Sequence, residues 1–488
     1  MTTAVKSVKK NYILNIIHQL MLVFIPLIVT PYVSRILGPD GIGKYSFAYT
    51  LISYFIIFVS LGFNVYGKRE IAKCSDVKKQ SAVFYEIVAC RAIFVFFAII
   101  TNLVLVWCGI YGKYGFLIML LICELVAVAF DITFFFHGKE EFGKLIIINL
   151  IFKILSTIGI FLLIKTPDHL GFYVLLNAGV SLGSNITMWL FLKNKLVKVQ
   201  FKELKIFRHL KNAPVLFLPI LAISLFNLID KSLIGLITQN DAENGYYVQT
   251  EKIVRKCILL INCLSIVMLP RNTHEISQGN VEQVKENNYQ AIHFVWLISL
   301  PLICVLIFTA SNLVPWFLGA EFVPSILLLQ VMAVAILFAG ISTVIGEQYL
   351  LPNKKDRQYV IAILVGVAIS LLVNIPLIYW LGALGATLTM VIAELIIMIV
   401  MLCIVRKEFA LGRVFKSLLK PLFASVSMIM VIWPLSIFLE PSILNTSLIV
   451  LCGALTYVVV ILILRDSLII NLLRNLKKQP QKQSDNNS

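Results

Sequence analysis

Apolar runs of about 20 residues follow one another from one end of this chain to the other, separated by short polar stretches. A helix of that length crosses the hydrocarbon core of a bilayer, which is about 30 Å thick. Lipid offers the backbone no hydrogen-bond partners, so only helices and closed barrels can span it. We therefore predict an all-α integral membrane protein that crosses the bilayer many times.

The composition agrees with this class, because 59% of the 488 residues are hydrophobic and only 14% are charged. Soluble domains have about 25% charged residues. The apolar runs predict about fourteen transmembrane helices, with ends uncertain by several residues. They lie near 12–37, 45–66, 83–108, 115–136, 145–164, 171–192, 213–237, 246–269, 289–309, 322–345, 359–378, 384–405, 421–439 and 447–464.

The most basic loop, with seven Lys and Arg between Lys193 and Lys211, reads as a linker between two lobes. Gly43-Lys44-Tyr45 opens the second predicted span, and Gly245-Tyr246-Tyr247 opens the eighth. This weak internal similarity, an echo between the two motifs, is of the kind that parallel repeats show. The predicted parts are an N-terminal lobe at 1–192 (spans 1–6), a cytoplasmic linker at 193–212, a C-terminal lobe at 213–405 (spans 7–12), two additional spans at 406–464 and a cytoplasmic tail at 465–488.

The Lys and Arg residues predict the orientation, because loops rich in them stay in the cytoplasm. Of the 42, the loops and tails on the side of the termini hold 32, whereas the opposite side holds only Lys44, Lys113 and Lys165. We predict a multi-pass membrane protein with both termini in the cytoplasm. The net charge of +17 thus reflects topology and anionic lipids as partners, and we expect no nucleic-acid partner.

Charged residues inside the spans are the main candidates for function, because each costs several kcal/mol unless it is paired or solvated. Lys252, Arg255 and Lys256 place three cations on one face of the eighth span. A cationic cavity that accepts an anionic group is one interpretation, and ion pairs that hold helices together, Glu251 with Arg255 and Asp230 with Lys252, are the other. The candidate substrate-binding residues are Arg35, Arg91, Lys153, Asp230, Lys231, Lys252, Arg255 and Lys256.

Three buried acids are candidates for coupling transport to an ion gradient: Glu124, Asp131 and Glu394. Helix rise places Arg91 at a depth between Asp131 and Glu124, which leaves a structural ion pair and a coupling site both open. Glu394 has no cation three or four residues away on its own helix. It is therefore the acid that we expect to titrate.

Several features argue against an enzyme. The predicted outer loops are too short to form a domain, and the chain has no Asp-x-Asp pair. The stretch Gly38 to Lys44 matches part of a phosphate-binding loop, but Tyr45 stands where Ser or Thr is needed, so we interpret it as a tight turn between helices. The nine cysteines and six histidines are scattered, so we predict no metal site and no cofactor.

A set of residues in fixed order extends along nearly the whole chain. It consists of Asn11, Pro26, Pro31-Tyr32, Arg35, Leu37-Gly38, Gly41, Gly43, Tyr45, Tyr54, Leu61-Gly62, Tyr66-Gly67, Arg69-Glu70-Ile71-Ala72, Asp131 through Gly138, Asp230-Lys231, Gly245-Tyr246-Tyr247, Glu251-Lys252, Leu269-Pro270-Arg271, Leu318-Gly319, Glu321-Phe322 and Gly346-Glu347-Gln348. This set resembles the Wzx-type polysaccharide flippases, of the multidrug/oligosaccharidyl-lipid/polysaccharide exporter superfamily, and implies a protein of the bacterial plasma membrane. Phe134 and His137 depart from the Trp and Gln that such proteins often have.

The resemblance implies two lobes around a central cationic cavity and a flippase for an undecaprenyl-pyrophosphate-linked oligosaccharide, working by alternating access. Membrane lipids, and the polymerase and glycosyltransferases of the same pathway, would be its partners. A pyrophosphate is a dense anion that Arg and Lys bind well, which agrees with the cationic face of the eighth span. The alternatives are a cation-coupled drug or metabolite antiporter of the same superfamily and, from another class, a membrane polysaccharide polymerase or ligase.

Overall fold

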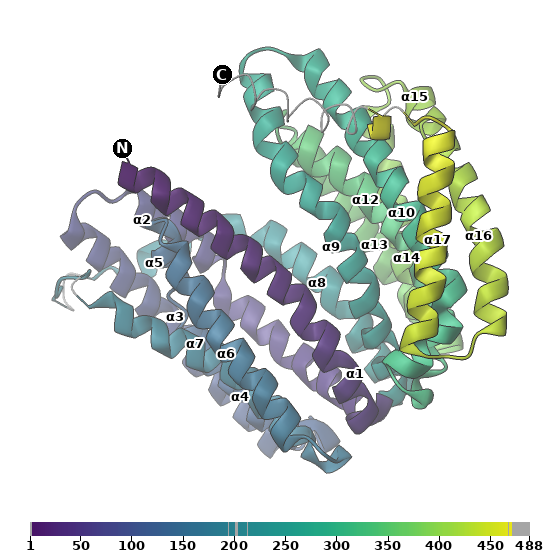
Figure 1. Ribbon diagram of the computed structural model, residues 1–488. Coiled ribbons are helices and arrows are strands. Elements are labelled where there is room, and N and C mark those ends of the chain that lie inside the picture. The colour runs from purple at the N-terminus through teal and green to yellow at the C-terminus, as the bar shows by residue number, and fades with distance from the viewer. Residues whose placement is uncertain (1, 194, 201–203, 212, 467, 471–488) are drawn as a thin grey trace. The chain divides into compact units, whose positions relative to one another are not determined.

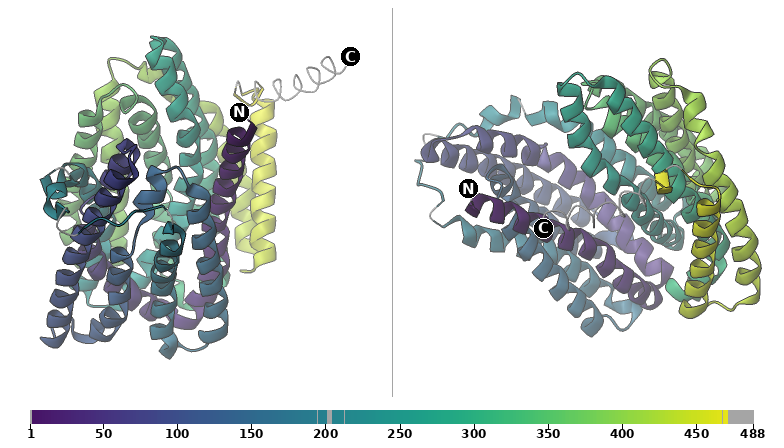
Figure 2. Two further views of the ribbon diagram at one scale, coloured as in Figure 1. Left: turned by 90° about the vertical axis from the view of Figure 1, so that its left-hand side faces the viewer. Right: turned by 45° about the horizontal axis from the view of Figure 1, so that its top comes forward.

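The structure is a computed structural model that describes residues 2–193, 195–200, 204–211, 213–466 and 468–470 (Figures 1 and 2). Its regular structure over these residues is helical, with no strand among them. The chain forms two compact units, Met1–Gly245 and Tyr246–Ser488. Helix α9 begins in the first unit and continues in the second.

The first unit holds eight α-helices and the start of a ninth over the described residues. They are α1 (Thr2–Ser60), α2 (Phe63–Lys73), α3 (Val77–Trp107), α4 (Gly115–Ala129), α5 (Thr133–Gly138), α6 (Phe142–Leu163), α7 (Leu170–Trp189), α8 (Ala213–Thr238) and the beginning of α9 (Asp241–Ser277), with 3-10 turns η1 (Gly112–Tyr114), η2 (Pro167–His169), η3 (Leu190–Leu192) and η5 (Ile206–Lys211).

The second unit holds the rest of α9 and eight further α-helices over its described residues. They are α10 (Val281–Phe317), α11 (Ser325–Met332), α12 (Ala335–Thr343), α13 (Asp356–Leu381), α14 (Ala383–Val405), α15 (Leu411–Lys416), α16 (Leu419–Phe438) and α17 (Ile443–Ile463), with the 3-10 turn η6 (Ala320–Phe322) and the π-helix η7 (Val344–Leu350).

The predicted class, a polytopic all-α membrane protein, is confirmed. Among the described residues, 12 helical stretches are long and apolar enough to cross a membrane. One of them, Phe24–Lys73, contains most of the first predicted span and all of the second, and α8, with 26 residues, covers the seventh. The predicted number of fourteen is therefore an approximation.

Local sequence sets where several helices begin and bend. The Asp76 side chain caps α3 by accepting from the backbone N–H of Lys78, and Ser442 caps α17 in the same way through Asn445. Within α1, Gly38 has non-helical angles (φ 64°, ψ 177°) and joins two helical parts. This agrees with the predicted helix-helix turn, because glycine adopts such angles without a steric penalty.

In the first unit, α4 packs between α1, α3 and α7, and α6 packs on α1 and α7. Helix α8 contacts α1, α2 and η5 in this unit, although the predicted C-terminal lobe would start with it. The two units are defined by contacts between helices, whereas the lobes were defined from the sequence. The predicted lobe boundaries therefore stay a prediction.

In the second unit, α13 lies against α14, and α16 and α17 pack on each other and on α10. Figure 1 shows α16 and α17 side by side, and Figure 2 shows them from two other directions. Met428 and Ile432 of α16 and Ile449 of α17 form the buried core of this group. Burial of such side chains between helices fixes these two final spans to α10.

Candidate functional site

Two helices of the first unit are broken inside predicted spans. The second span is interrupted between α1 and α2, where Leu61 (φ 39°) and Gly62 (φ 70°) have left-handed angles. The fourth span is interrupted between α4 and α5, over residues 130–132. A break leaves carbonyl groups without helical partners, which in a membrane must be satisfied by other groups of the protein.

Side chains from neighbouring helices satisfy the carbonyls at the α4–α5 break. Two amide or indole donors come from α7, and a guanidinium comes from α3. Asp131 also bonds the next helix, because its Oδ1 accepts from the backbone N–H of Thr133 at 2.9 Å. The carbonyl partners are Asn185 Nδ2 on Ala127 (2.8 Å), Trp189 Nε1 on Phe130 (2.9 Å) and Arg91 Nη1 on Asp131.

Arg91 joins the two breaks. Its side chain is only 1% exposed. Its Nη2 donates to Asn64 Oδ1 of α2 at 2.8 Å, and its Nη1 lies 3.7 Å from Asp131 Oδ2. Asn64 Nδ2 closes the triangle by donating to Asp131 Oδ2 at 2.9 Å. A side chain this enclosed has no surface left for cargo, so the geometry favours the structural ion pair over a substrate-binding role for Arg91.

A polar cavity of about 380 Å³ lies next to this break within the first unit. Asp131 and Lys153 both line it, so two charges far apart in the sequence share one cavity. The other polar lining residues are Thr133, Asn149, Ser181, Ser184 and Asn185. A cavity with this mixture of charges, hydroxyls and amides, between apolar helices, is typical of a site that binds a polar group.

Glu124 interacts with Ser181, one of the residues that line this cavity. It is buried on α4, and it interacts with the Ser181 hydroxyl and electrostatically with Tyr45 and Tyr49 of α1. The depth argument placed Glu124 and Asp131 on either side of Arg91, and the structure pairs Arg91 with Asp131. Glu124 interacts with the Ser181 hydroxyl instead.

The other candidates of the first unit lie on α1 and α8. Arg35 is exposed, whereas Asp230 is buried and Lys231 is half-buried. Asp230 interacts electrostatically with Tyr54, whose hydroxyl lies 2.7 Å from the Ser232 hydroxyl. Arg35 and the cavity-lining Lys153 are therefore the candidate cations of this unit that a polar cargo could reach.

In the second unit, the cationic face of α9 is open to contact. Lys252 and Arg255 are exposed, and Lys256 is half-buried. The predicted pair of Glu251 and Arg255 is present, with 2.7 Å between Arg255 Nε and Glu251 Oε1. The Arg255 side chain nevertheless keeps 41% of its surface exposed, so the pair does not enclose the guanidinium.

Glu394 has a cationic neighbour that the sequence analysis did not find. Arg255 of α9 interacts electrostatically with this half-buried carboxylate of α14. The sequence analysis considered only residues of the same helix, where Glu394 has no cation three or four residues away, and Arg255 comes from another helix. Tyr359 of α13 interacts with both Glu394 and Glu347, which adds two unpredicted residues to this cluster.

Outside the spans, the linker segment η5 is anchored to the first unit by a buried histidine. His209 Nδ1 lies 2.9 Å from the Tyr66 hydroxyl, and its Nε2 lies 2.8 Å from Glu86 Oε2. The Arg208 Nε and the backbone N–H of Lys205 also bond Glu86, at 2.9 and 2.8 Å. Burial lowers the pKa of His209, although Glu86 opposes this effect.

The chain is similar to known proteins over most of its length. The model of the family described as "Polysaccharide biosynthesis protein" matches residues 8–274. A protein of Escherichia coli K12, named as an O-antigen transporter, is 22% identical over 414 residues, which cover 84% of this chain and 99% of the relative. A protein of Shigella dysenteriae with the same name is 24% identical over 404 residues, covering 81% and 99%.

Two solved structures share the fold. The lipid II flippase MurJ in an inward closed conformation superposes with a TM-score of 0.73 and 16% identity, covering 94% of this chain and 99% of that one. An inward-facing multidrug resistance MATE family transporter of the MOP superfamily gives 0.65 and 16%, covering 80% and 95%. The resemblance seen in the sequence is thus confirmed for family and fold.

Proposed function

This chain belongs to the polysaccharide biosynthesis protein family, and from that premise we propose that it is a flippase for lipid-linked oligosaccharides. It moves undecaprenyl-pyrophosphate-linked repeat units from the cytoplasmic to the outer leaflet of the plasma membrane by alternating access. The names of its relatives, O-antigen transporters and a lipid II flippase, support a cargo that joins a glycan to a lipid. The polymerase and glycosyltransferases of the same pathway are the proposed protein partners.

The observation that carries the proposal is the exposed cationic face of α9. Lys252 and Arg255 lie inside a stretch apolar enough to span a membrane, and yet their side chains are exposed. Cations at such positions must meet water or a polar ligand, since exposure to lipid costs several kcal/mol. A pyrophosphate matches them, because guanidinium and ammonium groups bind phosphate oxygens strongly. Arg35, also exposed, is a further proposed contact.

The test is flipping of a lipid-linked oligosaccharide in reconstituted vesicles by Lys252→Ala and Arg255→Ala. We expect each change to lower the rate about tenfold, the effect of losing about 1.4 kcal/mol of binding, with unchanged abundance of the protein in the membrane. Arg255→Lys keeps the charge and should be milder. Lys165→Ala, which removes an exposed lysine outside this face, is the matched control. Normal flipping by the α9 variants would contradict the proposal, and so would an equal loss of protein in all of them.

Proton coupling is tested by measuring the flipping rate in the same vesicles with and without an imposed pH gradient. Glu124, Asp131 and Glu394 are the proposed coupling residues, and their surroundings differ. Asp131 is bound to Arg91 and Asn64, whereas Glu124 interacts with the Ser181 hydroxyl and Glu394 lies near Arg255. Equal flipping with and without the gradient would rule out proton coupling at all three.

A further inference from the structure

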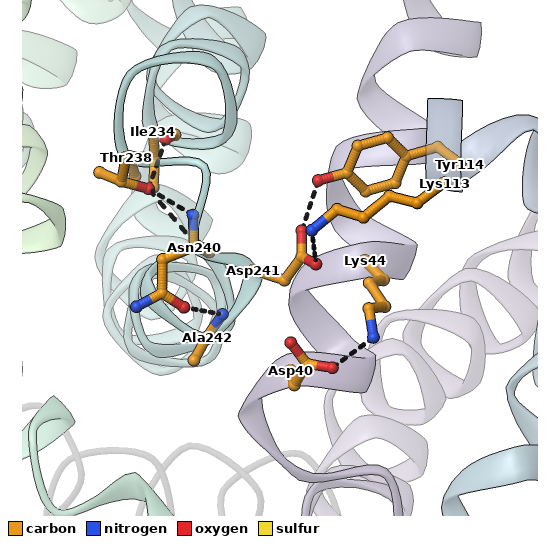
Figure 3. Close-up of polar contacts among 9 residues, drawn as sticks. All are labelled: Asp40, Lys44, Lys113, Tyr114, Ile234, Thr238, Asn240, Asp241 and Ala242. Atoms are coloured by element: carbon orange, nitrogen blue, oxygen red, sulfur yellow. Dashed lines mark hydrogen bonds and ion pairs between the residues drawn. The ribbon is translucent and has the colours of Figure 1, made fainter. Parts of the chain in front are cut away.

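The first turn of α9 is bonded to η1, the 3-10 turn directly before α4, through a buried carboxylate (Figure 3). Asp241, the first residue of α9, is only 3% exposed. Lys113 Nζ lies 2.5 Å from its Oδ2, and the Tyr114 hydroxyl donates to its Oδ1 at 2.5 Å. Both partners belong to η1, on the side of the membrane that the charge bias predicts to be outside. One carboxylate thus accepts from two donors of this turn.

Two glycines let the same turn of α9 pack directly on the backbone of α1. A Cβ atom on Gly43 would lie 1.7 Å from the carbonyl oxygen of Asp241, and one on Gly245 would lie 2.0 Å from that of Pro39. Gly43 follows Pro39 by four residues, and Gly245 follows Asp241 by four residues. Each segment therefore places a glycine against a carbonyl group of the other segment. This explains the echo between the two Gly-containing motifs: any larger side chain at either position would force the segments 39–43 and 241–245 apart.

A buried amide makes this closed arrangement costly. Asn244 is 0% exposed, and neither its Oδ1 nor its Nδ2 has a hydrogen-bond partner among the described residues. An unpaired buried polar group loses its hydration without compensation. Separation of the two segments would let water reach Asn244. Within one turn of α9, the Asp241 carboxylate therefore stabilises the packed arrangement and the Asn244 amide destabilises it.

From this opposition we infer that Asp241, Lys113 and Tyr114 form a latch that holds the first turn of α9 on α1 and η1. The latch keeps the outer side closed, and it must release for the outward-open half of the cycle. Beyond Gly245, α9 belongs to the second unit, so movement along the helix reaches the latch directly. The latch rests on the proposed alternating access, and Asn244 lowers the free energy needed to release it.

A distance measurement across the latch tests this inference without cargo. Spin labels would replace Ile110 and Gln239, both exposed and next to the latch, in the full-length protein in nanodiscs after replacement of its nine native cysteines. Pulsed electron paramagnetic resonance then gives the ratio of longer to shorter distances. We expect Lys113→Ala to raise this ratio about tenfold, because the buried Asp241 loses one of its two donors, and a hydrogen bond to a charged group contributes about 1.5 kcal/mol even where, as here, the lysine is half exposed. Tyr114→Phe should raise it less.

Asn244→Ala supplies the discriminating result, because it should act in the opposite direction. Added to Lys113→Ala, it should return part of the population to the shorter distance. The matched control is Asp40→Asn, which breaks the exposed pair between Asp40 and Lys44 beside the latch and should change nothing. Unchanged distances in both Lys113→Ala and Tyr114→Phe would overturn the latch, and so would a rise caused by Asn244→Ala. This measurement uses no cargo, so its result does not depend on the flipping assay. A failure of the latch and a failure of the proposed flipping can therefore be told apart.

Discussion

His209 is a buried imidazole with both ring nitrogens engaged, one by Tyr66 and the other by Glu86. Burial lowers its pKa in the folded protein, so the folded state favours the neutral ring. The unfolded or released segment has the ordinary histidine pKa of about 6.5 and binds a proton first as the pH falls. The anchoring of η5 is therefore complete above that pH and is lost as the pH falls below it toward the lowered value.

Because the pKa of His209 is lowered in the folded protein, we predict that acid releases the segment around η5. Trypsin should cut at Lys195 and Lys198 faster at about pH 5 than at about pH 8, on either side of the ordinary histidine pKa, once the rates are corrected for the protease itself. His209→Gln keeps hydrogen-bonding atoms but does not titrate there, so its cleavage should depend less on pH. The same pH dependence in both proteins would show that another group controls the linker.

At this scale the sequence predicts contacts within a helix and those that depth alone can place. The Glu251–Arg255 pair followed from their spacing, whereas helix rise placed Arg91 between Asp131 and Glu124 and did not choose between the two acids. Asn64 was missed, because an amide carries no charge and its partners come from two other helices. The interaction between Arg255 and Glu394 was missed because the two residues lie on different helices, and the sequence does not show how α9 and α14 pack.

Helices α2 and α5 pack in parallel immediately after the two breaks. A Cβ atom on Gly67 would lie 2.7 Å from the Phe134 ring, and one on Gly138 would lie 2.8 Å from Ile71. The contacts advance in step along both helices, 67 with 134 and 71 with 138. This close packing, together with the Arg91 triangle, makes the two short helices one block.

The close contact predicts that Gly67→Ala destabilises the protein. The added methyl group meets the buried Phe134 ring, and such overpacking costs about 1–3 kcal/mol. The midpoint of thermal unfolding in detergent should therefore fall. Gly179→Ala is the matched control, because a Cβ atom there meets nothing within 4 Å and alanine favours the helix. A midpoint that falls equally in both variants would mean that the packing of α2 on α5 is not the cause.

Hydropathy predicts the helices well and their interruptions poorly. Each span had to be an apolar helix because lipid allows little else. The break at 130–132 and the π-helix Val344–Leu350 depend on partners from other helices, such as Trp189 on the Phe130 carbonyl and Asn272 on the Gln348 carbonyl. Leu61 in a left-handed conformation carries no signal of its own, although the adjacent Gly62 does.

For the whole molecule, the distribution of cations is the strongest orientation signal. Loops and tails on one side hold 32 Lys and Arg, whereas the other side holds 3. Lys113 of the latch and Lys165 belong to the poor side, and His209 and the linker belong to the rich side. The predicted orientation would place the latch on the outer side and the histidine anchor on the cytoplasmic side.

A pair of reporter fusions tests that orientation. A reporter that is active only outside the cytoplasm should be silent after Lys198 and active after Asn240, and one that is fluorescent only inside should show the reverse. The two positions flank α8, a single helix of 26 residues that is long enough to span about 30 Å. If both fusions report the same side, α8 does not cross the membrane. A full exchange of sides would instead place the latch in the cytoplasm, where it could only control entry of cargo and not its release.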